Sequence, residues 1–453
     1  MIGIVVSRAD EASEHIGEHL LDVGDFERVA DDAYRADGFV LRAVEDLHIY
    51  ADDAADAFDE DPDLVVFVSR HSGETGPLLS AHYTGNFGAA EFGGDDRSLA
   101  PACPNAHHAV LDSLREYAPE EYEVAMECTH HGPTSVGSPS MFVELGSAEA
   151  EWRDPDGARA VARAVLDLEG TWPHGDRALV AFGGGHYAPR PTRILAETDW
   201  PVGHVAADWS LDDLGDPLEN RDVLDAMFEA SGAEHAVVDG EKPRVREAVA
   251  DLGYDVVSET WVRETDGVPL DLATDLEADL VGVDDGLRFG APASDHDGDY
   301  LVVDLPPALL DAAHAVDPGA TVAAGRQRAL AVVTEENGNR LAGAAAFASG
   351  NDYDALVDDL VDVLATDYDD VTREQAELTA VRETFDPAAA ADLGVPEGPA
   401  YGKLTNGQAV EYDGVTVTPD EVAREESVTV SVALRERARE RVRRPSDAEG
   451  KGN

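Results

Sequence analysis

The most constraining feature of the sequence is a regular alternation of short apolar runs and amphipathic segments over residues 1–255. The apolar runs have the length and β-branched content of buried strands, and the segments between them carry apolar residues at helical spacing. Alternation of this kind predicts an α/β fold with a doubly wound, mostly parallel sheet, which binds ligands beyond the carboxyl ends of its strands. Examples are the predicted strands 2–6, 63–71, 122–130 and 177–182, and the predicted helices 7–21, 155–168 and 242–254.

The composition changes after residue 255. Of the 15 histidines, only His296 and His314 follow residue 240. The second part indicates an α+β structure, with hairpins at Asn337-Gly338 and Asp413-Gly414 and an acidic amphipathic helix over 352–368. We therefore expect a first domain at 1–255, an α+β extension of unknown role at 256–434 and an arginine-rich tail at 435–453.

The net charge is extreme. The chain has 94 acidic and 33 basic residues, for a formal charge of −61, and the acidic residues are spread evenly between apolar segments. An even spread is typical of a folded protein from a high-salt cytoplasm, where repulsion between like charges is screened. It leaves no basic patch of the kind that binds DNA. The one basic cluster is residues 435–444, and a solvated tail explains it better than a nucleic-acid contact.

The amino terminus meets acidic residues within its first ten positions, unlike a secretory signal peptide, and no apolar run has the length of a membrane span. The two cysteines, Cys103 and Cys128, form neither a metal-binding pair nor a disulfide framework. We expect a cytoplasmic protein that does not contact a membrane.

Several histidines directly follow predicted strands. They are His71, the pair His130-His131 in "ECTHHGPTSVGS", and His186 in "FGGGHYAPR", and we expect them to meet at one rim of the sheet. If 122–131 stays extended, Glu127, Thr129 and His131 share one face. Residue type alone leaves open whether each histidine binds a metal, transfers a proton or is a hydrogen-bonded structural residue. Imidazole and carboxylate groups suit zinc, but no local spacing such as HExxH supports a metal.

Three glycines, Gly183, Gly184 and Gly185, stand between a predicted strand and His186. Such a run lets backbone N–H groups approach a phosphate or an oxyanion. A tight turn explains a lone glycine run about as often.

Four motifs occur in a fixed order after the first strand "IGIVVS": "SRHSGETGPLLSAHYTGN", "ECTHHGPT", "FVELGS" and "FGGGHYAPR". Together they resemble the archaeal and plant type of D-aminoacyl-tRNA deacylase, over residues 1 to about 255. The resemblance implies hydrolysis of the ester between a D-amino acid and the 3′ end of tRNA, dependence on zinc, and an α/β fold similar to peptidyl-tRNA hydrolases and nucleoside phosphorylases.

On this basis we expect a zinc-assisted deacylase, favoured as a monomer, with D-aminoacyl-tRNA as its partner. The expected roles are metal ligation by His71, His131 and His186, catalysis by Glu127, Glu144 and His130, and substrate binding by Thr129, Gly183, Gly184 and Gly185. The alternative is a metal-dependent small-molecule hydrolase or phosphorylase on the same fold, which the lack of a basic patch favours. A binding module without catalysis is a weaker third option.

The charge predicts that the protein needs salt to stay folded. Screening extends over about 3 Å in molar salt and about 10 Å at 0.1 M, so dilution strengthens repulsion between the acidic residues. We expect circular dichroism to show loss of structure between molar and millimolar KCl. An unchanged spectrum would contradict the interpretation that the charge is an adaptation to high salt.

Overall fold

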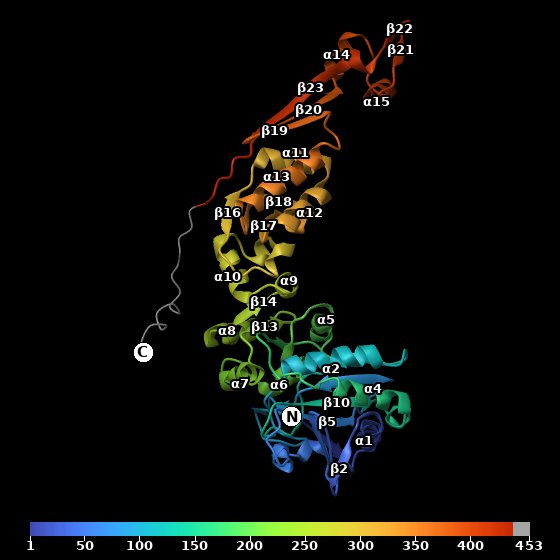
Figure 1. Ribbon diagram of the computed structural model, residues 1–453, viewed down its shortest axis with the longest axis vertical. Coiled ribbons are helices and arrows are strands. Elements are labelled where there is room, and N and C mark those ends of the chain that lie inside the picture. The colour runs from blue at the N-terminus through green and yellow to red at the C-terminus, as the bar shows by residue number, and fades with distance from the viewer. Residues whose placement is uncertain (438–453) are drawn as a thin grey trace, which may run out of the picture. The chain divides into compact units, whose positions relative to one another are not determined.

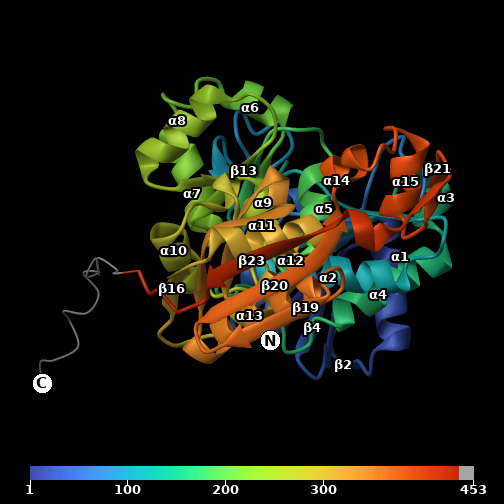
Figure 2. The same cartoon turned by 90° about the horizontal axis from the view of Figure 1, so that it is seen from above.

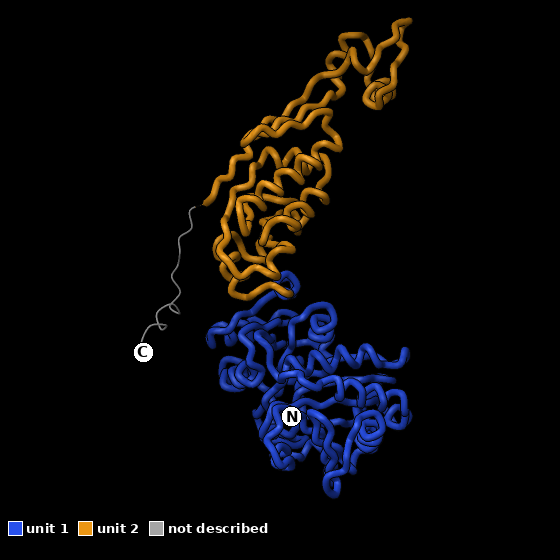
Figure 3. Tube along the Cα trace, in the orientation of Figure 1, with its two compact units in different colours: residues 1–266 blue, residues 267–453 orange. Residues whose placement is uncertain are grey.

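The computed structural model describes residues 1–437, and the chain divides into two compact units after Asp266 (Figure 1, Figure 3). The boundary lies later than the residue 255 expected from composition. Strand β14 (Asp255–Val257) still pairs in parallel with β13 (His235–Val238) of the first unit. Helix α9 (Glu259–Glu264) contributes Glu259, whose carboxylate lies 2.6 Å from the guanidinium of Arg193 in the same unit.

The first unit contains an eight-stranded sheet that is mostly parallel at its centre. Strand β1 pairs in parallel with both of its neighbours, and antiparallel pairs occur on the β2–β3–β4 side and between β10 and β6. The predicted α/β fold with a mostly parallel sheet is confirmed. In sheet order the strands are β2 (Glu27–Ala30), β3 (Ala33–Ala36), β4 (Phe39–Val44), β1 (Ile2–Ser7), β5 (Leu64–Arg70), β10 (Ser140–Gly146), β6 (Leu78–His82) and β9 (Glu123–Met126).

Helices cover one face of this sheet. They are α1 (Glu11–Val23), α2 (Pro104–Tyr117) and α4 (Pro155–Leu166), with the short α3 (Glu149–Trp152) preceding α4 (Figure 2). Helix α1 begins where the buried Asp10 accepts the N–H groups of Ala12 and Ser13, which satisfies donors left free at a helix start. The opposite face packs against loops rather than helices, through a cluster that includes Phe58, Phe67 and Phe142.

The alternation of strands and helices continues in a second, fully parallel sheet rather than in one large sheet. Its order is β12–β11–β13–β14, and its core joins Val180 and Phe182 of β11 to Met227 and Phe228 of α7. The remaining elements here are β11 (Leu179–Phe182), β12 (Val202–Ala206), α5 (Pro189–Glu197), α6 (Asp208–Leu214), α7 (Arg221–Ser231) and α8 (Pro243–Leu252), with a small sheet of β7 (Gly85–Asn86) and β8 (Ser98–Leu99).

The second unit is α+β, as its sequence indicated. A four-stranded sheet of order β15–β17–β18–β16 packs against α11, α12 and α13, and a three-stranded antiparallel sheet, β19–β20–β23, shares its core. Both expected hairpins are present, as β17–β18 and β21–β22. The bounds are α10 (Leu270–Asp279), β15 (Leu287–Phe289), β16 (Leu301–Asp304), α11 (Pro307–Val316), α12 (Pro318–Arg328), β17 (Ala331–Glu335), β18 (Arg340–Phe347), α13 (Gly350–Leu364), β19 (Asp370–Glu374), β20 (Glu377–Phe385), α14 (Pro387–Asp392), α15 (Pro399–Thr405), β21 (Val410–Tyr412), β22 (Val415–Val417) and β23 (Ala423–Ser431).

The arginine-rich tail begins beside β16. The N–H of Arg437 donates to the carbonyl of Val302 at 2.8 Å, and the N–H of Asp304 donates to the carbonyl of Arg435 at 3.3 Å. The rest of the tail, residues 438–453, lies outside the described residues. Among the helices of residues 1–437, none combines the length and apolarity needed to cross a membrane.

Candidate metal centre and active site

The segment after β9 connects the two sheets of the first unit. Successive backbone N–H groups donate to different elements: Glu127 to Ala81 at 3.1 Å, Cys128 to His186 at 2.7 Å, and Thr129 to Val205 at 2.9 Å. The strand expected over 122–130 therefore ends at Met126, because its backbone leaves one sheet for the other. The expected alternation of side chains between two faces is lost with it.

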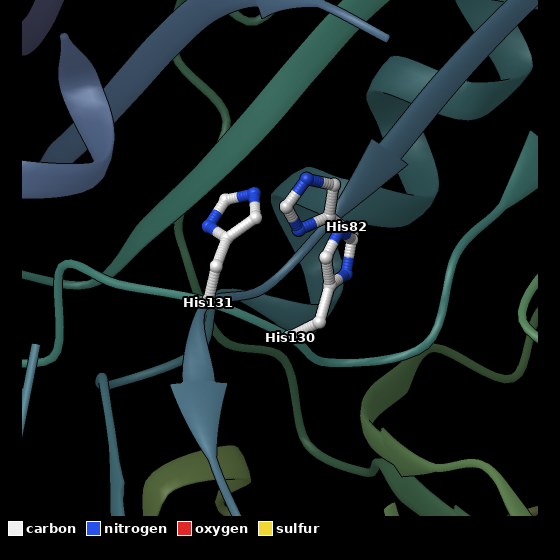
Figure 4. Close-up of side chains that lie close together, drawn as sticks. All are labelled: His82, His130 and His131. Atoms are coloured by element: carbon white, nitrogen blue, oxygen red, sulfur yellow. The ribbon is translucent and has the colours of Figure 1, made fainter. Parts of the chain in front are cut away.

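Three imidazoles meet beside this segment. His82 ends strand β6, and His130 and His131 follow the connecting segment (Figure 4). Each Nδ1 lies within hydrogen-bond distance of a backbone carbonyl, so Nδ1 is the donor in each ring, and Nε2 keeps a lone pair wherever the ring is neutral. The carbonyl partners are Tyr83 for His82 at 3.0 Å, Cys128 for His130 at 2.8 Å, and Gly132 for His131 at 2.7 Å.

Ring nitrogens of these three residues lie within 4.8 Å of one another, the spacing of ligands around one metal ion. Burial, with the charge of His82, lowers the pKa of His131 to about 4, and burial also holds the pKa of His130 well below its usual value. Both side chains are therefore neutral near pH 7, as a metal ligand must be. Backbone carbonyls that fix the Nδ1 proton are the outer partners that metal-bound histidines usually have.

His82 differs from the other two. Burial lowers its pKa, but the carboxylate of Glu144 outweighs this effect and raises it overall. Its Nε2 lies 3.6 Å from Oε1 of Glu144 and makes no hydrogen bond within residues 1–437. A lone pair that faces a carboxylate and two other lone pairs needs a positive charge between them, from a proton or from a metal ion. The donor set fits zinc, with three histidines and an open position.

Two buried carboxylates lie next to the imidazoles, with His71 between them. Nδ1 of His71 is 3.1 Å from Oε1 of Glu127 and 3.5 Å from Oε2 of Glu144. Burial alone would lower the pKa of His71, but the two carboxylates raise it to about 11. Burial alone would raise the pKa of Glu127, but hydrogen bonds from His186 and His71 hold it well below its usual value. His71 is thus an imidazolium between two carboxylates.

The second oxygen of Glu127 faces two more histidines. Oε2 lies 2.7 Å from Nε2 of His186 and 3.9 Å from Nε2 of His130. On the other side of the His186 ring, Nδ1 is 3.5 Å from the sulfur of Cys128. Burial, with the charge of Glu127, raises the pKa of the Cys128 thiol to about 12. Cys128, His130 and His186 form a further group with metal-ligand spacing, and His71, Glu127 and Glu144 form another.

The structure brings together all six residues expected as ligands or catalysts: His71, Glu127, His130, His131, Glu144 and His186. His71 follows the carboxyl end of β5 and Glu127 follows that of β9, but the strands that carry the cluster do not all run in the same direction. Strand β6 runs antiparallel to β10, so that Glu144 lies directly opposite Ser80 and Phe142 opposite His82. The cluster therefore lies across a face of the sheet, where neighbouring strands of opposite direction contribute to it.

Thr129, expected to contact substrate, has its hydroxyl engaged within the core. The oxygen accepts the N–H of Val205 at 3.1 Å and lies 2.9 Å from Nδ1 of His204. The opposite nitrogen of His204 is 2.8 Å from the carbonyl of Ala100. Thr129 is fully buried, and it fastens the connecting segment to β12.

The glycine run forms a tight turn. Gly183 and Gly184 adopt φ values of 94° and 84°, in the region that favours glycine. A Cβ on Gly183 would lie 2.3 Å from Cε of Lys242 and 2.7 Å from the carbonyl oxygen of Asp239. The N–H of Gly183 donates to Ala206 at 2.7 Å. Close packing explains why a glycine is required at position 183. Gly184 and Gly185 therefore remain the candidates for contact with substrate.

Four further residues belong to the site: His82, Cys128, Tyr187 and Trp209. His82 ends β6 and lies in the same motif as His71, but no strand was predicted before it. Tyr187 follows His186, and its hydroxyl lies 3.2 Å from Nε2 of His71. No sequence signal marks Trp209, which reaches the site from α6.

A cavity of about 480 Å³ opens onto His130 and His131. This volume is within the usual range for small-molecule sites, about 300–1,000 Å³. Two aromatic side chains line it while remaining unusually open, since Phe92 is 62% exposed and Trp209 is 43% exposed. The remaining lining residues are Asn86, Ala89, Glu91 and Asp213.

Comparison with known proteins places this site in a family. A family model described as D-aminoacyl-tRNA deacylase matches residues 58–257. A D-aminoacyl-tRNA deacylase of Halobacterium salinarum is 68% identical over the full length of both chains. The protein of the same name from Natronomonas pharaonis is 54% identical, over 94% of this chain and 98% of its own.

A solved structure has a similar fold. It is the crystal structure of AF0625, a conserved protein of unknown function, with 33% identity and a TM-score of 0.53. The match covers 96% of that chain and 58% of this one, whereas the haloarchaeal relatives extend across both units. Because relatives of the same name match from end to end, the chain belongs to the D-aminoacyl-tRNA deacylase family.

Proposed function

We propose that this chain hydrolyses the ester bond of D-aminoacyl-tRNA, with a zinc ion held by His82, His130 and His131, and releases the D-amino acid and free tRNA. The observation that carries the proposal is the end-to-end match to relatives named D-aminoacyl-tRNA deacylase. The expectation of an enzyme of this family agrees with that match. Because aminoacyl-tRNA is used in the cytoplasm, the proposed activity agrees with the cytoplasmic location expected from the sequence.

The three imidazoles support the choice of ligands. Their Nδ1 protons are fixed by backbone carbonyls, which leaves Nε2 of each ring as the donor atom. His71, expected as a ligand, is instead assigned to the carboxylates, because its Nδ1 faces Glu127 and Glu144 and its Nε2 faces the hydroxyl of Tyr187. A zinc ion bound by the three histidines would polarise the ester carbonyl and make a water molecule more acidic.

Glu127 is the proposed general base. One of its oxygens faces His71 and the other faces His186 and His130, so the carboxylate is held at the centre of the cluster. His71 keeps Glu127 and Glu144 ionised and is in turn held by Tyr187. Glu144 orients His82 and His71 through its two oxygens. His186 positions Glu127, and with Cys128 it provides a further pair of donors.

The alternative of a small-molecule phosphorylase has less support in the cavity. Glu91 and Asp213 line it, and no lysine or arginine does. A phosphate substrate would therefore meet carboxylates and no cation from the protein. A substrate that carries an ammonium group, as an aminoacyl ester does, suits the same lining.

The proposed activity predicts stereochemical preference. In molar KCl, we expect the protein to release D-tyrosine from D-tyrosyl-tRNA and to leave L-tyrosyl-tRNA largely intact, as measured by the loss of charged tRNA. The absence of hydrolysis, or equal rates on the two substrates, would show that the proposal is wrong.

Metal removal tests the ligand assignment. We expect a chelator to abolish hydrolysis and zinc to restore it. His131→Ala should lower both the amount of bound zinc and the rate of hydrolysis. The rate should fall by more than about 100-fold, because losing a metal ligand lowers activity more than losing a residue that only hydrogen-bonds to a ligand. His108→Gln, on α2 and outside the cluster, should retain both. Zinc is measured by elemental analysis of the pure protein, and full activity without zinc would exclude this role.

Glu127→Gln keeps the shape of the side chain and removes its charge. We expect kcat to fall by about 10²–10⁴-fold, the usual contribution of a general base. Glu123→Gln is the matched control, because Glu123 is exposed on β9 four positions earlier and should retain full kcat. Retained zinc together with low kcat would assign Glu127 to proton transfer, and unchanged kcat would remove it from catalysis.

A further inference from the structure

Phe92 and Trp209 are the two aromatic residues among those that line the cavity, and neither has a role in the proposed hydrolysis. Single exposed hydrophobic side chains are common on protein surfaces. Here two exposed aromatic rings line one cavity, and histidines of the site line the same cavity. Open aromatic faces beside a reactive centre are how proteins bind unstacked bases, because every base has a π face that stacks on an aromatic ring.

Both aromatic residues are attached directly to the histidine cluster. The carbonyl of Phe92 accepts the N–H of Gly132 at 3.0 Å, and Gly132 follows His131. Trp209 lies on α6, where its ring stacks beside that of His186 with centroids 6.5 Å apart. Phe92 and Trp209 line the same cavity as His130 and His131, so a base bound there shares the cavity with these imidazoles.

The charge of the lining decides which part of a nucleotide can enter. Glu91 and Asp213 form no ion pair within residues 1–437, and the lining contains no lysine or arginine. Two unpaired carboxylates repel phosphate and accept a neutral base or an ammonium group. The 5′ phosphate of a bound nucleotide therefore has to remain outside the cavity.

Resting on the proposed function, we propose that the cavity receives the 3′-terminal adenosine of the tRNA, with its base stacked between Phe92 and Trp209. The aminoacyl ester on the ribose then points to His130 and His131, and its ammonium group faces Glu91 and Asp213. The rest of the tRNA extends away from the cavity through the 5′ phosphate. Recognition of the acceptor end thus comes from stacking and shape, without a phosphate contact in the cavity.

Calorimetric titration in molar KCl tests binding without any catalytic step. Adenosine should bind the full-length protein, and adenosine 3′-monophosphate should bind more weakly, because its phosphate takes the place of the aminoacyl group and meets Glu91 and Asp213. Phe92→Ala and Trp209→Ala should each weaken adenosine binding about tenfold or more. Trp172→Ala is the matched control, since Trp172 is 69% exposed and does not line the cavity. Unchanged affinity in both cavity variants, or tighter binding of adenosine 3′-monophosphate than of adenosine, would overturn the inference.

Kinetics separate this inference from the proposed function. With D-tyrosyl-tRNA, Phe92→Ala should raise KM about tenfold and leave kcat within about twofold, and Phe92→Tyr should keep the KM of the unmodified protein. Circular dichroism confirms that each variant is folded. Adenosine binding without ester hydrolysis would reject the proposed function and retain the cavity assignment. D-specific hydrolysis with unchanged KM in Phe92→Ala and Trp209→Ala would reject the cavity assignment and retain the function.

Discussion

Three consecutive backbone hydrogen bonds, from Glu127 to Thr129, hold the candidate site in place. They bind one short segment to β6, to the loop of His186 and to β12, so that two sheets share a single piece of backbone. Glu127 and Cys128 lie within this segment, and His130 and His131 follow it directly. The same hydrogen bonds that join the sheets therefore also set the distances between the imidazoles and the carboxylates.

The second constraint is the burial of charge. Glu127 and Glu144 are almost completely buried, and a buried carboxylate is stable only with close partners. His71 supplies a positive charge to both, and its own pKa rises as a result. One negative charge remains, and the carboxylate of Glu144 raises the pKa of His82. A proton on His82 or a cation held by the histidines would balance that charge.

The sequence predicted the parts of this site but not its arrangement. His71, His130, His131 and His186 were identifiable because each follows an apolar run, and the α/β class followed from the alternation of strands and helices. The direction of β6 was not identifiable, because an antiparallel strand in a mixed sheet has the same local pattern as a parallel one. The contacts of Thr129 in the core were not identifiable, because its partner, His204, is remote in sequence. Trp209 and Phe92 stand out only once folding shows that they remain exposed beside one cavity.

Salt weakens interactions between charges on the surface more than interactions between charges in the interior. Surface pairs such as Arg28 with Asp31 lie in solvent, where molar salt reduces attraction and repulsion alike. The cluster around Glu127 is buried, and screening reaches it much less. The strength of the interactions between surface charges therefore changes with the salt concentration of the medium, whereas the interactions within the buried cluster change much less. For a chain that must bind a polyanion under these conditions, phosphate contacts contribute little to affinity. The interactions that salt leaves largely intact are the stacking of bases and the ligation of a metal ion by imidazoles, and the candidate site has aromatic and histidine side chains suited to both.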